Sequence, residues 1–303
     1  VPFMLQVCFQ SFFVVAERPQ LGLAYSIAAG VTNMVLDYVL IAVFHLGIAG
    51  AAIATVLGYV VGGIIPLFYF ATGERSGLRL TRSQLYPRQL LQACSNGSSE
   101  LMSNISASIV SMLYNVQLLR YAGENGVAAY GVIANISLVV TAVYTGISQG
   151  IQPLVSTAHG QDRPGLIRQY LRYALITLLV LSAALYLLLF LFAGPVALIF
   201  NSEGDPRLQQ IAEEGLRLYF TGALFAGFNI ILSMYFTSVE RALPAHITSL
   251  LRGFLLILPM AFLLAACWGM TGVWLAFPLT EAVTAALGAG FYALYARRGR
   301  ARS

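Results

Sequence analysis

Residues 12–18, FFVVAER, reappear in weaker form as residues 235–241, YFTSVER, and this repeat decides the fold. A second pair follows each copy, because GIAG at 47–50 corresponds to GMTG at 269–272. The offset is 223 residues at the first pair and 222 at the second. Self-similarity at a constant offset is the signature of a duplicated architecture. We therefore expect two structurally related halves.

The second copy is preceded by three long apolar segments that have no counterpart before the first copy. They begin near Gln89, whose equivalent one repeat earlier would lie roughly 130 residues before Val1. We therefore expect this chain to hold the last two-thirds of a duplicated protein. About the first three and a half helices would then be missing from it.

The composition indicates a membrane protein. Hydrophobic residues make up 58% of the chain and charged residues only 10%, with a mean hydropathy of +0.78. Soluble domains carry a charged share nearer a quarter. Apolar runs of about 20 residues are long enough to cross a bilayer as helices, so the fold class is an all-α polytopic membrane protein. The expected spans are a shortened one at 1–16 and full ones at 20–44, 48–71, 90–119, 126–156, 168–198, 208–238, 243–266 and 270–295.

Arginine placement orients the spans. Six spans separate the two Glu-Arg turns, so both turns lie on one membrane face and the repeat is parallel. If that face is cytoplasmic, it carries thirteen arginines against three on the other face, which is a positive-inside bias. The basic balance therefore indicates topology and contact with membrane lipids, and no nucleic-acid binding. The expected organisation is an N-terminal lobe remainder at 1–71, a cytoplasmic linker at 72–89, a C-terminal lobe at 90–296 and a basic cytoplasmic tail at 297–303.

Three acids lie within expected spans, where an ionisable side chain is costly and needs a reason. Asp37 follows Asn33 by one helical turn, and Thr55 lies at a matching depth on the next helix. Carboxylate, amide and hydroxyl oxygens suit a proton or an alkali cation. The sequence thus predicts a cation-coupling site with a possible Na⁺ position at Asn33, Asp37 and Thr55. A structural hydrogen-bond cluster is the alternative.

Glu100 is the second membrane acid. Ser103 and Asn104 follow it at helical spacing, so the three form a polar stripe that faces a bundle interior or a water-filled cavity. We expect Glu100 to take part in cation coupling, with interhelical hydrogen bonding by a protonated carboxyl as the alternative. Glu281, the third acid, has Tyr59 as its repeat equivalent and is interpreted as structural or at the lipid edge. Arg252 is expected to snorkel toward the cytoplasmic end.

A second polar stripe runs along the expected 126–156 span to Pro153, where proline should bend the helix. This stripe and Asn229 are expected to line an amphiphilic substrate cavity that accepts organic cations. For Tyr130, the aromatic residue of the stripe, packing inside the bundle is the alternative. Three cysteines without ligand spacing are expected to be small buried hydrophobic residues. The cavity residues are Tyr130, Asn135, Gln149, Gln152 and Asn229, and the cysteines are Cys8, Cys94 and Cys267.

Three motifs resemble the multidrug and toxic compound extrusion (MATE) family: residues 146–154 (GISQGIQPL), the run from Asn33 through 47–55, and the repeated Glu-Arg turn. The resemblance implies twelve helices in two six-helix lobes, of which this chain holds the end of the fourth through the twelfth. It also implies a first-lobe cation site to which Asn33, Asp37 and Thr55 correspond, and a membrane glutamate to which Glu100 corresponds. The family's second-lobe aspartate has no acidic counterpart here, and Asn229 is the nearest polar residue.

The function implied is a monomeric, multi-pass transporter of the bacterial inner membrane. It would export cationic or amphiphilic organic compounds by antiport with Na⁺ or H⁺, with no cofactor. One alternative is a flippase for a lipid-linked saccharide, which would want a basic cavity for pyrophosphate. Another is a non-transporting truncated remnant. An enzyme is not expected, because no nucleophile-base or metal constellation is present.

Overall fold

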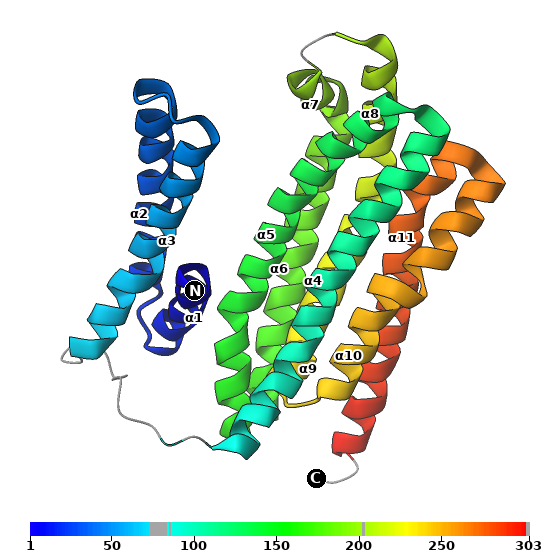
Figure 1. Ribbon diagram of the computed structural model, residues 1–303. Coiled ribbons are helices and arrows are strands. Elements are labelled where there is room, and N and C mark those ends of the chain that lie inside the picture. Colours follow the sequence, from blue (N-terminus) through cyan, green and yellow to red (C-terminus); the bar gives the residue numbers. More distant parts are fainter. Residues whose placement is uncertain (73–83, 85, 202–203, 301–303) are drawn as a thin grey trace. The chain divides into compact units, whose positions relative to one another are not determined.

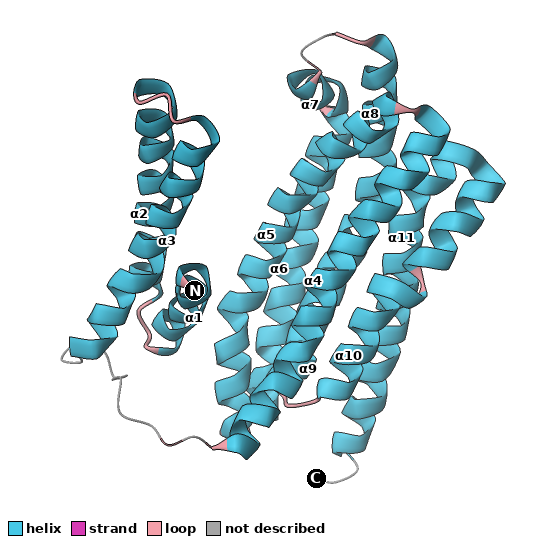
Figure 2. Ribbon diagram, viewed as in Figure 1, coloured by secondary structure: helices cyan, strands magenta, loops and turns pink. Residues whose placement is uncertain are grey.

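The computed structural model describes residues 1–72, 84, 86–201 and 204–300, excluding the side chains of 96, 99, 100, 103, 242 and 296–300. The described residues form helices joined by short turns (Figure 2). The chain divides into two compact units, Val1–Leu85 and Tyr86–Ser303, called unit 1 and unit 2 below. Most of the expected linker at 72–89, and the end of the tail at 301–303, lie outside the described residues.

Unit 1 contains three helices packed through small residues. Its core is formed by Phe9 and Phe13 of α1 and Phe70 of α3. Four small residues recur every fourth position along α3 and so share one face, which lets neighbouring backbones approach closely. The elements are α1 (Pro2–Val15), α2 (Pro19–Asp37), the π-helix η1 (Tyr38–Val43) and α3 (Gly47–Thr72), and the small residues are Gly50, Ala54, Gly58 and Gly62.

Unit 2 is a larger helical bundle (Figure 1). The start of α4, the α5–α6 and α9–α10 turns and the end of α11 lie at one end of this unit. Its elements are α4 (Pro87–Ala122), α5 (Glu124–Gly160), α6 (Pro164–Leu191), α7 (Ala193–Phe200), α8 (Pro206–Tyr219), the 3₁₀ turn η2 (Phe220–Gly222), α9 (Ala223–Ser238), α10 (Ala242–Leu250), the π-helix η3 (Leu251–Leu255) and α11 (Ile257–Arg300).

Within the described residues, six helical stretches are long and apolar enough to cross a membrane. One of them, Leu243–Tyr295, consists of two helices that meet at Gly269, whose φ of +60° breaks the helical path. The expected span at 168–198 is interrupted instead, because α6 ends at Leu191 and the short helix α7 starts at Ala193. Pro153 lies inside α5, which is assigned as one continuous helix.

The repeated Glu-Arg turn has the same backbone in both units. Glu17 and Glu240 take left-handed conformations, with φ of 56° and 57°. The next residue, Arg18 or Arg241, donates its backbone N–H to the carbonyl five residues earlier at 2.8 Å in both cases. Asp162 at the α5–α6 turn repeats this geometry with a φ of 53°. The same helix-terminating motif therefore occurs three times in the described structure, and its acidic side chain is exposed each time.

The paired glycines of the second motif have distinct roles. Gly47 and Gly269 adopt positive φ angles of 54° and 60°, which only glycine takes readily. Gly50 packs against the backbone of Leu40, and Gly272 packs against the backbone carbonyl of Leu264. Glycine in the first position thus makes the turn, and glycine in the second lets the following helix approach the end of the preceding one.

Asp205 caps α8, which begins at the end of unit 2 opposite to the α5–α6 turn (Figure 1). Its carboxylate accepts hydrogen bonds from the backbone N–H of Arg207 at 2.7 Å and of Leu208 at 3.4 Å, and from Asn125 Nδ2 at 2.8 Å. The backbone hydrogen bond from Arg207 is the main reason that the pKa of Asp205 is lowered. This cap connects the start of α8 to the start of α5.

An aromatic cluster forms the centre of unit 2. Tyr114 stacks on Tyr130 with ring centroids 5.1 Å apart, and Tyr219 stacks on Phe277 at 4.3 Å. Tyr114 also contacts Tyr219 edge to face and lies beside Trp274. The cluster joins α4, α5, α8 and α11.

The prediction of buried cysteines is wrong. Cys8, Cys94 and Cys267 are all free and exposed on the surfaces of their helices. A small sulfur side chain is compatible with lipid as well as with a protein core, so hydrophobicity alone did not distinguish the two environments.

The packing of Gly272 yields a stability prediction. A Cβ at Gly272 would collide with the backbone carbonyl of Leu264, whereas a Cβ at Gly290 on the same helix meets nothing within 4 Å. We expect Gly272→Ala to destabilise the protein by about 1–3 kcal/mol, as overpacking does. Gly290→Ala should be neutral or slightly stabilising. Thermal unfolding in detergent measures both, and equal melting temperatures for the two variants would contradict the assigned contact.

Candidate functional site

In unit 1, α2 and α3 bring the predicted cation-coupling residues to adjoining positions. Asn33 Nδ2 lies 3.5 Å from Thr55 Oγ1, to which it donates, and Thr55 Oγ1 donates to the carbonyl of Ala51 at 2.9 Å. Gly58 permits this approach, because a Cβ there would lie 3.1 Å from Asn33 Cβ. Asn33 and Thr55 are therefore neighbours across two helices.

Asp37 differs from its neighbours in lacking a partner. It is the last residue of α2, directly before the π-helix η1, and its Oδ1 atom is buried without a hydrogen-bond partner in the described structure. A buried polar atom left unsatisfied costs free energy, so such an atom asks for an explanation. A proton or a monovalent cation bound by the carboxylate would satisfy it, with the oxygens of Asn33 and Thr55 as further hard ligands.

Glu100 lies in α4, but its side chain is outside the described structure. The backbone nevertheless defines the face to which it belongs. The polar residues that follow at intervals of three or four occupy the same face of α4, which is exposed or half-buried. They are Asn104, Ser108, Ser111 and Asn115, and their helical spacing was a signal available in the sequence.

The five residues expected to line a substrate cavity do not share one surface. Tyr130 is buried in the aromatic cluster and lies within hydrogen-bonding reach of Ser111. Asn135 and Gln149 are exposed on α5, and Gln152 is half-buried beside Pro153. Asn229 on α9 has no exposed surface and contacts a different helix. Of these five residues, Asn135 and Gln149 are the ones exposed to a ligand in unit 2 as described.

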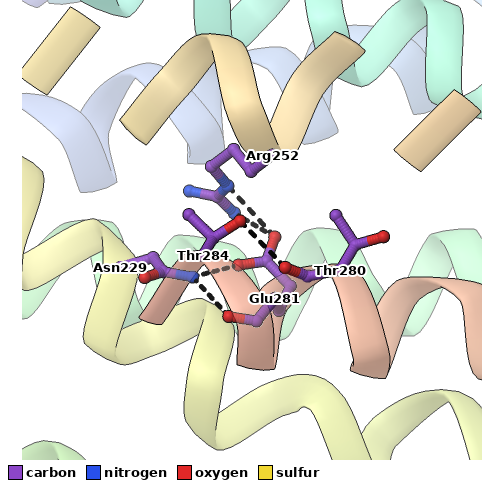
Figure 3. A network of polar contacts seen from close by, with 5 residues as sticks. All are labelled: Asn229, Arg252, Thr280, Glu281 and Thr284. Carbon is purple, nitrogen blue, oxygen red and sulfur yellow. Dashed lines mark hydrogen bonds and ion pairs between the residues drawn. The ribbon is translucent and has the colours of Figure 1, made fainter. Parts of the chain in front are cut away.

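A second polar cluster in unit 2 was not anticipated from the sequence. Glu281 of α11 is 3% exposed, and its Oε1 accepts from Arg252 Nε at 3.0 Å and pairs with Arg252 Nη2 at 2.8 Å. Its Oε2 accepts from Asn229 Nδ2 at 2.7 Å (Figure 3). Asn229 Nδ2 also donates to the backbone carbonyl of Glu281 at 3.0 Å. We call Arg252, Glu281 and Asn229 the buried charge cluster.

This cluster corrects two interpretations. Arg252 does not snorkel toward the end of its helix; it points into the bundle and pairs with Glu281. Of the two roles expected for Glu281, the lipid-edge one is wrong, because its side chain is sealed from solvent and bonded on both oxygens, whereas a structural role is compatible with these bonds. The sequence signal was weak, since the pair is separated by 29 residues and its arginine lies on a π-helix that shifts the usual helical register.

The equivalent positions in unit 1 carry no charge. By the repeat offset of 222 to 223 residues, Asn229 corresponds to Gln6 or Val7, Arg252 to Ala29 or Gly30, and Glu281 to Tyr59 or Gly58. The related arrangement of helices therefore forms without an ion pair in unit 1. Replacing buried ion pairs by apolar groups is often neutral or stabilising, so such pairs are weak evidence for a purely structural role.

The surroundings define what the cluster can do chemically. Tyr219 of the aromatic cluster lies close enough to interact electrostatically with both Glu281 and Arg252. Two surface depressions, of about 510 Å³ beside Asn115 and about 380 Å³ beside Glu214, are lined by residues outside the buried charge cluster. Within the described part of the chain, no three His, Cys, Asp or Glu residues are grouped as metal ligands. The cluster can therefore act through hydrogen bonds and through the charges of Arg252 and Glu281.

Comparison with known proteins places these features in context. A family model described as MatE matches residues 101–263, more than half of the chain. The multidrug export protein MepA of Staphylococcus saprophyticus is 23% identical, covering 88% of this chain and 58% of that protein. The FAD transporter of Shewanella oneidensis is 27% identical, covering 84% of this chain and 56% of that protein. The chain therefore spans less than two thirds of the length of these curated relatives.

Solved structures show the same fold. A mutant of the Vibrio cholerae MATE transporter VcmN matches with a TM-score of 0.87 at 22% identity, covering 98% of this chain and 67% of that one. An outward-facing multidrug resistance MATE family transporter matches with a TM-score of 0.83 at 21% identity, over 89% of this chain and 61% of that one. At such identities the likeness establishes the helical architecture.

The buried charge cluster predicts a non-additive pattern of stability. Arg252→Gln or Glu281→Gln alone leaves one buried charge unpaired and should destabilise the protein by about 3–5 kcal/mol. The double variant removes both charges and should cost clearly less than the sum of the two single changes. Thermal unfolding of the four proteins in one detergent gives the cycle. Strictly additive losses would show that the two side chains do not interact.

Proposed function

Because the chain belongs to the MatE family of membrane transporters, we propose that the complete protein exports organic compounds in exchange for Na⁺ or H⁺. The substrates proposed are cationic or amphiphilic, and the site of action is a bacterial inner membrane in which the protein works as a monomer. The names of the two curated relatives support transport of small organic molecules but differ in substrate, since one is called a multidrug export protein and the other an FAD transporter.

The unpartnered carboxylate oxygen of Asp37 carries the proposal. A carboxylate kept from water in an apolar bundle is costly when charged, so binding of a positive ion there changes the free energy of the conformation that contains it. Asn33 lies one helical turn before Asp37 and contacts Thr55, so the side-chain oxygens of these two residues are the further ligands proposed. If the organic substrate favours a different conformation, the two ligands bind in alternation, which is the thermodynamic basis of antiport.

Glu100 is proposed as a second coupling carboxylate. Its helix presents a continuous polar face from Asn104 to Asn115, which suits a helix bordering a water-filled path. The exposed Asn135 and Gln149 of α5 are proposed as substrate contacts on the neighbouring helix, since α4 and α5 pack together. Rocking of two related lobes would alternate access to these groups.

Substitution of the membrane acids tests coupling. In the complete protein, Asp37→Asn and Glu100→Gln should each abolish coupled efflux of a fluorescent organic cation, because neither amide can exchange a positive ion. Glu124→Gln is the matched control, since that acid is exposed at the start of α5. Efflux is measured in vesicles with an imposed Na⁺ or H⁺ gradient. Unchanged rates in both acid variants would refute these assignments.

A further inference from the structure

The guanidinium of Arg252 has an edge that its ion pair does not use. Nε and Nη2 both contact the same oxygen of Glu281, Oε1, instead of forming the two-oxygen fork common to arginine–carboxylate pairs. Oε2 accepts from Asn229 Nδ2 at 2.7 Å instead. Nη1 makes no hydrogen bond to the described residues and points away from the carboxylate (Figure 3).

The two partners differ in accessibility. The side chain of Arg252 is 21% exposed, whereas that of Glu281 is 3% exposed. Nη1 is also not among the buried, unpartnered side-chain atoms. A dissolved molecule that reaches the cluster therefore meets the guanidinium before the carboxylate. Cations would be repelled there, and a group with two acceptor oxygens would match the free Nη1–Nη2 edge.

The cluster also holds that edge in a fixed place. Glu281 anchors the guanidinium to α11, and Asn229 anchors the carboxylate to α9. The backbone carrying Arg252 is fixed by its neighbour, because Gly253 packs directly against Ser106 of α4. Preorganised donors of this kind bind a ligand with little further loss of conformational freedom.

We propose that Arg252 is an anion-binding residue of unit 2 that receives a carboxylate or phosphate group of a transported molecule, with Glu281 as the buried counter-charge that orients it. The proposal rests on the transport function proposed above and adds an acidic group to the substrates that the protein accepts. Arg252 and Glu281 together are neutral as a pair, which limits the cost of keeping an arginine at this depth. The absence of charge at the equivalent positions of unit 1 indicates that the fold does not require the pair.

Two dyes with the same xanthene ring test the proposal: anionic carboxyfluorescein and cationic rhodamine 123. Equilibrium binding to the purified complete protein is measured by fluorescence anisotropy. The Arg252→Gln/Glu281→Gln double variant, which removes both charges together, should bind carboxyfluorescein at least tenfold more weakly than the wild type does. Arg252→Lys should also weaken binding, because an ammonium lacks the planar fork.

Arg120→Gln, which removes an exposed arginine at the end of α4, is the matched control and should leave carboxyfluorescein binding unchanged. Wild-type affinity in the double variant would overturn the proposal. A lipid phosphate is the competing source of the same chemistry, so binding of phosphatidylglycerol is measured in parallel. If the double variant loses lipid binding and keeps dye binding, the site belongs to a headgroup and the substrate assignment is overturned.

Rhodamine 123 separates this proposal from the general one. If ion-coupled efflux of rhodamine 123 is absent while carboxyfluorescein binds through Arg252, export of cations fails and the anion site stands. If rhodamine 123 efflux is normal and carboxyfluorescein does not bind the wild-type protein, export of cations stands and the anion site fails. Each variant is first checked for a single size-exclusion peak, and binding is measured below its melting temperature.

Discussion

A charged group sealed inside an apolar bundle is costly unless the protein supplies a partner for it, and this constraint shapes the centre of unit 2. Water cannot satisfy Glu281 at 3% exposure, so Arg252 and Asn229 must do so. Satisfying one carboxylate thereby links α9, η3 and α11 at a single point. The aromatic cluster continues from this point, because Tyr219 lies within electrostatic reach of the pair and stacks on Phe277.

The duplicated backbone and the placement of charge obey different rules. Glu17 and Glu240 share their left-handed turn, and Gly47 and Gly269 share positive φ angles, although most residues around them differ. These features are local, because each depends on a few consecutive residues and their backbone hydrogen bonds. The charges of the Glu-Arg turn are shared, but those of Arg252 and Glu281 are not, so the two units have the same backbone frame while each carries its own polar groups within the bundle.

Sequence reasoning reached the local features and missed the tertiary one. The fold class, the helical spans and the repeat follow from hydrophobic runs and from glycine and Glu-Arg motifs, which act over short distances. The proximity of Asn33 and Thr55 was also predictable, because adjacent antiparallel helices join positions of matching depth. Arg252 and Glu281 could not be paired in this way, since a π-helix and a glycine break at Gly269 separate them and alter the register. The span break after Leu191 did have a local signal in Gly194-Pro195, because Pro195 has no N–H to donate to the carbonyl of Leu191 four residues earlier, and the expected 168–198 span overlooked it.

The carboxylates of Asp37 in unit 1 and Glu281 in unit 2 are therefore in opposite conditions. Asp37 has an oxygen with no partner among the described residues, whereas Glu281 has both oxygens occupied. An unsatisfied carboxylate gains free energy from an incoming positive ion, but a satisfied one must first lose its arginine. Asp37 therefore fits the cation site proposed for it better than Glu281 would, and Arg252 in unit 2 has donors that its ion pair does not use. Related helices can in this way support ligands of opposite charge, because the identity of a few buried residues, and not the shared backbone, determines which charge is left unmatched.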